Sequence, residues 1–113
     1  MALIDEKPRI IRALSDIPGL ARALPAWPDD WAALPCIVVS EASNMPADHR
    51  DDRERITELE YYVRVFAKRA EQIAQVASAV DDIMQDLGYS RNMVWDDDSA
   101  EVRQKVMRYR IYL

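Results

Sequence analysis

The sequence is short of the residues from which most catalytic and metal sites are built. Its 113 residues include a single cysteine, Cys36, a single histidine, His49, and two glycines, Gly19 and Gly88. One cysteine excludes an internal disulfide and fits a reducing compartment. Two isolated glycines leave no glycine-rich phosphate loop and no nucleophile elbow. We therefore expect a protein that is not an enzyme and that needs no cofactor.

An excess of positive charge and long hydrophobic runs are also lacking. Lysine and arginine number 15 against 20 aspartate and glutamate, so the net charge is −5. Nucleic acids and anionic membranes attract clustered basic residues, and we expect specific binding to neither. No apolar run approaches the roughly 18 residues of a membrane span. Residues 1–6 turn acidic too early for a secretory signal, which predicts a cytoplasmic protein.

What is present is the composition of one globular domain. Half of the residues are hydrophobic and 31% are charged. Domains commonly contain about 100–150 residues, so residues 1–113 are predicted to form a single domain.

Two segments have the spacing of helices. In residues 4–16, Ile10 and Leu14 recur at helical intervals, Asp5 can cap the start, and Pro18 with Gly19 ends the segment. Residues 69–87 form the stronger helix and end before Gly88, a natural residue after a helix. Its apolar stripe consists of Ile73, Val76, Ala77, Val80, Ile83, Met84 and Leu87.

Four segments read as strands: residues 36–40, 56–67, 89–95 and 102–113. The second and fourth alternate clearly between apolar and polar side chains, which gives each strand one core face. The predicted fold is α+β in the order α-β-β-α-β-β. It has a four-stranded, mostly antiparallel sheet with helices packed on one face.

Two segments connect the predicted elements. The proline-rich residues 20–35 include Trp27, Trp31 and Leu34, and they either cover the domain or present a tryptophan to a partner. Residues 43–55 are predicted to be a flexible charged loop, since they have almost nothing to bury. Its mobile residues are Asp48, His49, Arg50, Asp51, Asp52 and Arg53.

Neither polar cluster makes a convincing metal or catalytic site. His49 lies beside carboxylates, but a lone histidine in a loop is a poor ligand set. Asp96, Asp97 and Asp98 with Glu101 offer oxygen ligands to a hard cation, but their spacing matches no EF-hand. A hairpin turn over residues 96–100 is the simpler interpretation, and no metal site is predicted.

The remaining signals are those of a protein interface. Strand residues 102–113 place arginines and a tyrosine on the face away from the core, and residues 56–67 add acidic and aromatic side chains. Such mixtures are typical of interfaces, although an ordinary solvated face is the alternative. The predicted interface set is Arg103, Lys105, Arg108, Arg110, Tyr112, Glu58, Glu60, Tyr62, Phe66, Asp96, Asp97 and Asp98.

The order of elements resembles that of small tail-terminator, tail-completion or minor tail proteins of bacteriophages and prophages. The resemblance spans nearly the whole chain and rests on loose features. These are the short first helix, the Asp16 to Leu20 segment, the proline-rich crossing, the strand around Tyr61 and Tyr62, the second helix and the closing strand around Tyr109.

The resemblance implies a structural protein of the virion tail, present in the bacterial host cytoplasm during assembly. Such proteins form a ring, usually of six copies, that caps the tail tube and joins it to a head-completion or connector protein. The resemblance also implies that residues 43–55 order on the ring, where their acidic residues with Glu58 would line a lumen for DNA. The arginines of the last strand would meet Asp96, Asp97 and Asp98 of a neighbour. The alternative from another class is a small ligand-binding or regulatory α+β module that acts as a dimer, with a pocket between sheet and helices.

Overall fold

The computed structural model describes residues 3–50, 53–98 and 102–113, and of residues 48–50 and 53–55 it describes the backbone only. The α+β class with two helices is confirmed, and the sheet has five strands rather than the four expected. The elements are α1 (Lys7–Leu14), β1 (Arg22–Leu24), β2 (Cys36–Arg50), β3 (Arg53–Ala67), α2 (Ala70–Asp86), β4 (Ser90–Asp97) and β5 (Arg103–Tyr112).

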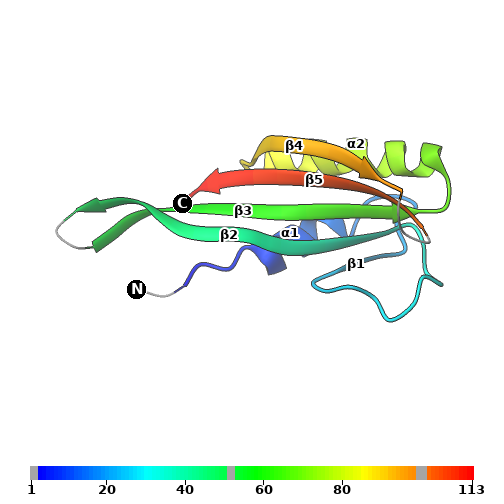
Figure 1. The fold of residues 1–113 in the computed structure, drawn as a ribbon, viewed down its shortest axis with the longest axis horizontal. Coiled ribbons are helices and arrows are strands. Elements are labelled where there is room, and N and C mark those ends of the chain that lie inside the picture. Colours follow the sequence, from blue (N-terminus) through cyan, green and yellow to red (C-terminus); the bar gives the residue numbers. More distant parts are fainter. Residues whose placement is uncertain (1–2, 51–52, 99–101) are drawn as a thin grey trace.

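The sheet is antiparallel except at one edge. Its strand order is β1-β2-β3-β5-β4, and β1 runs parallel to β2 (Figure 1). The sequence did not indicate β1, because this strand has only three residues and lies within the proline-rich connection. The backbone N–H of Ala21 donates to Pro35 O at 2.8 Å and extends the pairing by one bond.

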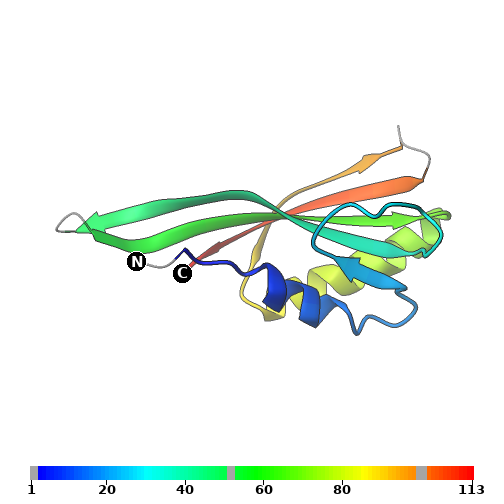
Figure 2. The same cartoon turned by 90° about the horizontal axis from the view of Figure 1, so that it is seen from below.

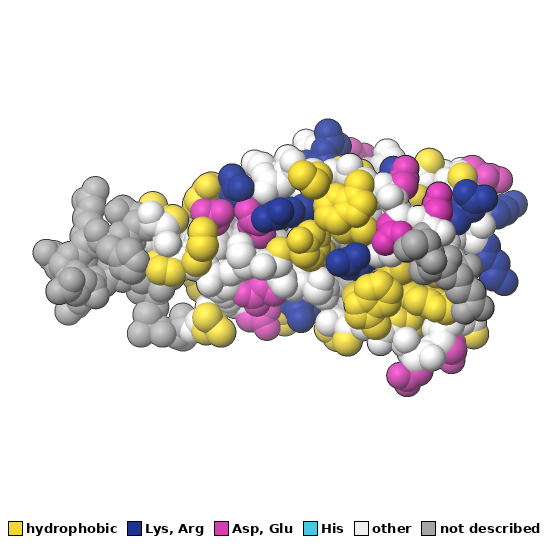
Figure 3. All heavy atoms as spheres, viewed as in Figure 1, with side chains coloured by type: hydrophobic (Ala, Val, Ile, Leu, Met, Phe, Trp, Pro, Cys, Tyr) yellow, Lys and Arg dark blue, Asp and Glu magenta, His cyan; other side chains and the backbone are white. Residues whose placement is uncertain are grey.

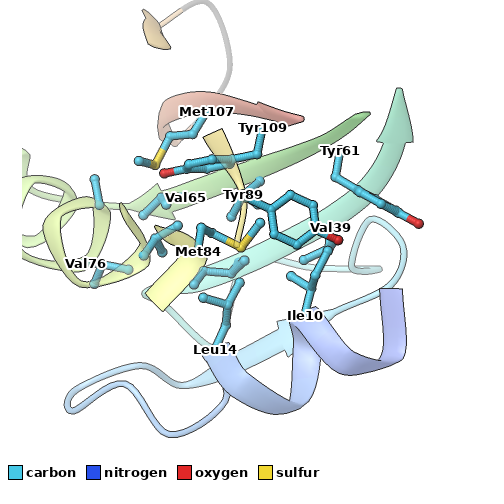
Figure 4. Packing of buried hydrophobic residues seen from close by; sticks show 14 of the residues in the cluster. Ile10, Leu14, Val39, Tyr61, Val65, Val76, Met84, Tyr89, Met107 and Tyr109 are labelled. Atoms are coloured by element: carbon cyan, nitrogen blue, oxygen red, sulfur yellow. The ribbon is translucent and has the colours of Figure 1, made fainter. Parts of the chain in front are cut away.

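Both helices cover the same face of the sheet, as expected (Figure 2). Ile10 and Leu14 of α1 and Val80 and Met84 of α2 are fully buried against it. The sheet contributes alternate residues of three strands, including Val39, Tyr61, Val63, Val65, Met107 and Tyr109 (Figure 4). This cluster is the main hydrophobic core.

A smaller cluster lies on the opposite face, which we call the open face. Cys36, Val38 and Phe66 are fully buried there. Trp31 and Leu34 of the proline-rich connection pack over them. The connection therefore covers one end of the open face, and the Cys36 thiol is buried beneath it.

The predicted loop over residues 43–55 is wrong for the part that is described. Strand β2 continues to Arg50 and β3 begins at Arg53, and their backbones pair almost to the tip. The last pairs are Asp48 with Ile56, His49 with Glu54, and Arg50 with Arg53. The backbone therefore forms a ribbon rather than a solvated loop, while Asp51 and Asp52 lie outside the described residues.

The ribbon projects beyond the body of the molecule (Figures 1 and 2). β5 accompanies β3 only as far as Tyr112, which pairs with Glu58, and Leu113 and Thr57 then exchange backbone hydrogen bonds of 2.7 and 2.9 Å. Past this point β2 and β3 pair only with each other among the described residues. We call residues 46–50 and 53–56 the arm; it contributes to molecular extents of 51 × 26 × 25 Å.

Candidate interaction surfaces

The open face gathers many of the residues predicted to form an interface. Glu60 and Tyr62 of β3 pair across the sheet with Arg110 and Arg108 of β5, and Glu58 pairs with Tyr112. All six side chains share one face because strand residues two apart point to the same side. The sheet register thus pairs residues that are 46–54 positions apart in the sequence.

Glu60 lies at the centre of this face and is only 2% exposed. Its carboxylate accepts hydrogen bonds from Arg108 Nε at 2.8 Å, Arg110 Nε at 2.9 Å and Asn92 Nδ2 at 3.2 Å. Arg108 Nη2 also contacts Glu60 Oε2. Burial by itself raises the pKa of Glu60, but the hydrogen bonds and charges of the two arginines outweigh it and hold the pKa below its ordinary value.

The two arginines are therefore engaged within their own chain. Arg110 additionally lies 3.3 Å from Glu58 Oε1 through its Nε. The expected pairing of Arg108 and Arg110 with acidic residues of a neighbour would have to compete with Glu60. Their first role in this structure is to neutralise a buried carboxylate.

Arg103 and Lys105 are separated from these arginines. Both residues lie at odd positions of β5, so their side chains are on the helix-covered side, opposite to Arg108. Lys105 Nζ forms an ion pair with Asp96 Oδ1 at 2.9 Å. A hollow of about 200 Å³ beside the start of α2 is lined in part by Arg103, Lys105, Asp96 and Asp98. The predicted interface set therefore occupies two faces.

An aromatic strip crosses the open face beside the Glu60 network. It consists of Trp27, Arg64, Tyr62 and Trp95. The guanidinium carbon of Arg64 lies 5.5 Å from the ring centre of Trp27 and 5.1 Å from that of Tyr62. The Tyr62 and Trp95 rings meet edge to face at 6.0 Å. Figure 3 shows hydrophobic side chains gathered on this face, with basic side chains among them.

Sequence reasoning included only Tyr62 of this strip in the interface set. Arg64 could have been found from its even position in the alternating segment 56–67, on the same side as Tyr62. Trp27 and Trp95 come from a connection and an edge strand whose places in the sheet are set by tertiary packing. Arg and aromatic residues together are enriched at protein interfaces, so the strip strengthens the case for binding on this face.

The edge strand β4 exposes a second group of apolar residues. Met93 is 55% exposed, and Val94 and Trp95 are each 37% exposed. β4 pairs with β5 on one side and is the last strand in the sheet order. The sequence predicted a strand over residues 89–95, but it did not indicate that the strand is an edge.

The structure adds no support for a metal site. In the described part of the chain, no group of three or more histidine, cysteine, aspartate or glutamate residues could hold a metal ion. Glu101, and the turn residues Ser99 and Ala100, lie outside the described residues. The side chain of His49 is likewise not described.

The alternative function, a small ligand-binding or regulatory module, predicts a pocket between the sheet and the helices. The central space there is occupied by Leu14, Val80 and Met84, each 0% exposed. A hollow of about 740 Å³ lies elsewhere and opens to solvent; it is lined by Asp29, Asp30, Trp31, Lys68, Val102 and Arg103.

Comparison with models of known protein families and with curated protein sequences found no match. Within the described residues, neither helix combines the length and hydrophobicity needed to cross a membrane.

Proposed function

We propose that this protein is a structural component of a bacteriophage or prophage tail. Several copies, six in the simplest case, would form a ring on the end of the tail tube, stop tube growth and join the tail to the head. Its partners would be further copies of the chain, the tube protein and a head-completion or connector protein. The observation that carries this proposal is the projecting arm.

The arm is expected to need a partner surface. A two-stranded hairpin is at best marginally stable in water unless a third strand or a helix supports it. β5 supports β3 only to the Thr57–Leu113 pair, and the arm continues beyond it. Ile56 of the arm is 39% exposed and Met45 at its base is 50% exposed. Burial of these side chains against a neighbour would stabilise the arm.

An arm of this kind suits a ring of identical subunits. Ring closure requires a contact in which one part of a subunit meets a different part of the next. The projecting arm and the body with its packed core supply two such distinct parts. The body adds the aromatic strip on its open face, which offers Trp27, Tyr62 and Trp95 as anchors for a neighbour or for the tube.

The ligand-binding module gains no comparable support. The centre of its expected pocket between sheet and helices is filled by core side chains, as described above. The hollow of about 420 Å³ that remains between α2 and β4 is open to solvent, and its lining includes the charged side chains of Asp81, Arg91 and Lys105. The projecting arm has no evident purpose in such a module. We therefore favour assembly over small-molecule binding.

The test uses the tube protein encoded in the same genome, polymerised in the presence and absence of the full chain. We expect shorter tubes with a ring at one end, seen by negative-stain electron microscopy. A variant in which Asn-Gly replaces residues 47–56 retains the Pro46–Thr57 pair and the Thr57–Leu113 bonds. It should fold, as judged by circular dichroism and denaturation, but should not cap tubes.

Two results would count against the proposal in different ways. If the intact chain leaves the distribution of tube lengths unchanged, the tail function is wrong. If the arm-shortened variant caps tubes as efficiently as the intact chain, the function stands and the role of the arm is wrong.

A further inference from the structure

β4 is the less protected edge of the sheet. Edge strands expose unpaired backbone groups, and proteins usually blunt them with proline, bulges, charges or short length. At the other edge, β1 has only three residues, and β2 beyond it contains Pro46 and three register shifts. In β4 the register shifts once, between Arg91 and Met93, and the strand then pairs regularly with β5 through Asp97.

The regular part of β4 presents apolar side chains on both of its faces. Met93 and Trp95 pair with Arg108 and Val106 of β5 and share the open face. Val94 between them points to the helix-covered side. The three residues are 55%, 37% and 37% exposed, so an apolar edge segment is left uncovered by the chain itself.

We propose that two copies of this chain pair through β4, antiparallel and about a two-fold axis at Val94. The two five-stranded sheets would then form one continuous sheet. In this register Met93 lies opposite the partner's Trp95, a favourable contact between a thioether and an aromatic ring. Arg91 takes no part in this match, because it lies beyond the register shift on the helix-covered side and forms an ion pair with Asp81 of α2 at 3.1 Å.

The neighbouring registers are less favourable. A two-fold axis at Trp95 would place Val94 opposite the partner's Asp96. An axis at Met93 would place Val94 opposite the partner's Asn92, at the register shift. Both alternatives set an apolar side chain against a polar or charged one, and each reduces cross-strand complementarity. The order of residues in β4 thus favours one self-complementary register.

This contact goes beyond the tail function proposed above. An isologous contact closes at two copies and cannot by itself build a ring. It does not involve the arm, so it describes how the free protein covers its open edge. The dimer and tube capping can therefore be tested separately.

Disulfide cross-linking tests the register directly. Residues directly opposite each other on antiparallel strands have Cβ atoms about 4.5–5.5 Å apart, whereas diagonal neighbours are about 7–8 Å apart. With mild oxidant, Val94→Cys should form a covalent dimer. Met93→Cys and Trp95→Cys should each cross-link poorly alone, but their mixture should yield the heterodimer. The native Cys36 is fully buried, and the unmodified chain is the control.

Sedimentation velocity over a concentration series tests the contact without cysteines. The intact chain should be a dimer, and Met93→Asp should raise the dimer dissociation constant at least about tenfold, because an unpaired carboxylate would be placed opposite an indole in the contact. Met45→Asp changes a similarly exposed methionine at the base of the arm (50% against 55%) and should leave the constant unchanged. The arm-shortened variant should also remain a dimer.

A monomeric intact chain, or Val94→Cys that does not cross-link, would overturn the dimer and leave tube capping untouched. Cross-linking by Met93→Cys alone that matches Val94→Cys would overturn the register. Loss of the dimer in the arm-shortened variant would place the contact on the arm instead of β4.

Discussion

At the scale of single residues, Glu60 links three strands of the sheet. Its carboxylate is held by Arg108 and Arg110 of β5 and by Asn92 of β4. A buried carboxylate with these donors stabilises the fold only while it is ionised, because the arginines depend on its charge. The contact therefore makes stability depend on pH.

We expect Glu60→Gln to lower the free energy of unfolding at pH 7 by about 1.5–3 kcal/mol, the usual worth of hydrogen bonds to a charged group. The pKa of Glu60 is lowered in the folded protein, against about 4.3 in the unfolded chain. Its stabilisation is thus present above the unfolded pKa and is lost as the pH falls through the folded pKa. The difference between the two proteins should shrink below about pH 4.

Urea denaturation between pH 7 and pH 3 measures this difference. Glu71→Gln, in the exposed first turn of α2, is the control and should change stability by less than about 0.5 kcal/mol. A difference between the intact chain and Glu60→Gln that stays constant across this pH range would show that the charge of Glu60 contributes nothing.

Residue alternation predicted this face but not its network. Even positions of residues 56–67 and 102–113 were assigned to the non-core side, and Glu60, Arg108 and Arg110 are indeed together there. That Glu60 is buried could not be predicted, because its burial depends on β4 lying beside β5 and supplying Asn92. Arg103 and Lys105 were grouped with the arginines by composition, whereas their odd positions place them on the other face.

At the scale of elements, the proline-rich connection stabilises one end of the open face. Trp31 packs on Phe66 with ring centres 4.6 Å apart, and Trp27 meets the same ring at 5.1 Å. Trp31 is partly buried in the small cluster, whereas Trp27 is 53% exposed. The two tryptophans thus share a neighbour but differ in burial.

This difference predicts unequal effects of truncation. Trp31→Ala should destabilise the protein clearly, though by less than the roughly 3–5 kcal/mol typical of a fully buried tryptophan. Trp27→Ala should cost much less, because most of its surface already meets water. Chemical denaturation of the two variants gives the comparison, and equal losses would contradict this account of the connection.

The elements that sequence reasoning found are those with a buried face. Residues 69–87 and 56–67 showed the periods of a helix and a strand because one side of each packs into the core. The arm lacks such a pattern, since among the described residues no element covers it, and its polar sequence was taken for a loop. β1 was missed because three residues cannot show a period.

At the scale of the whole molecule, the body, which has a packed core, and the arm have different sources of stability. The middle of β3 has strands on both sides, a helix-covered face and a partly covered open face. The arm has only the pairing of β2 with β3 beyond the end of β5. Local opening should therefore cost much less free energy in the arm than in the body.

Hydrogen exchange followed by mass spectrometry measures this difference. In the free protein, amides of residues 47–50 and 53–56 should exchange at least about tenfold faster than those of residues 59–66. On tubes, the arm amides should become protected because the partner supplies the missing contacts, while those of residues 59–66 should change little. Arm amides as slow as the body in the free protein would show that the arm is stable without a partner. The principal structural argument for assembly would then fall, even if β4 still formed a dimer.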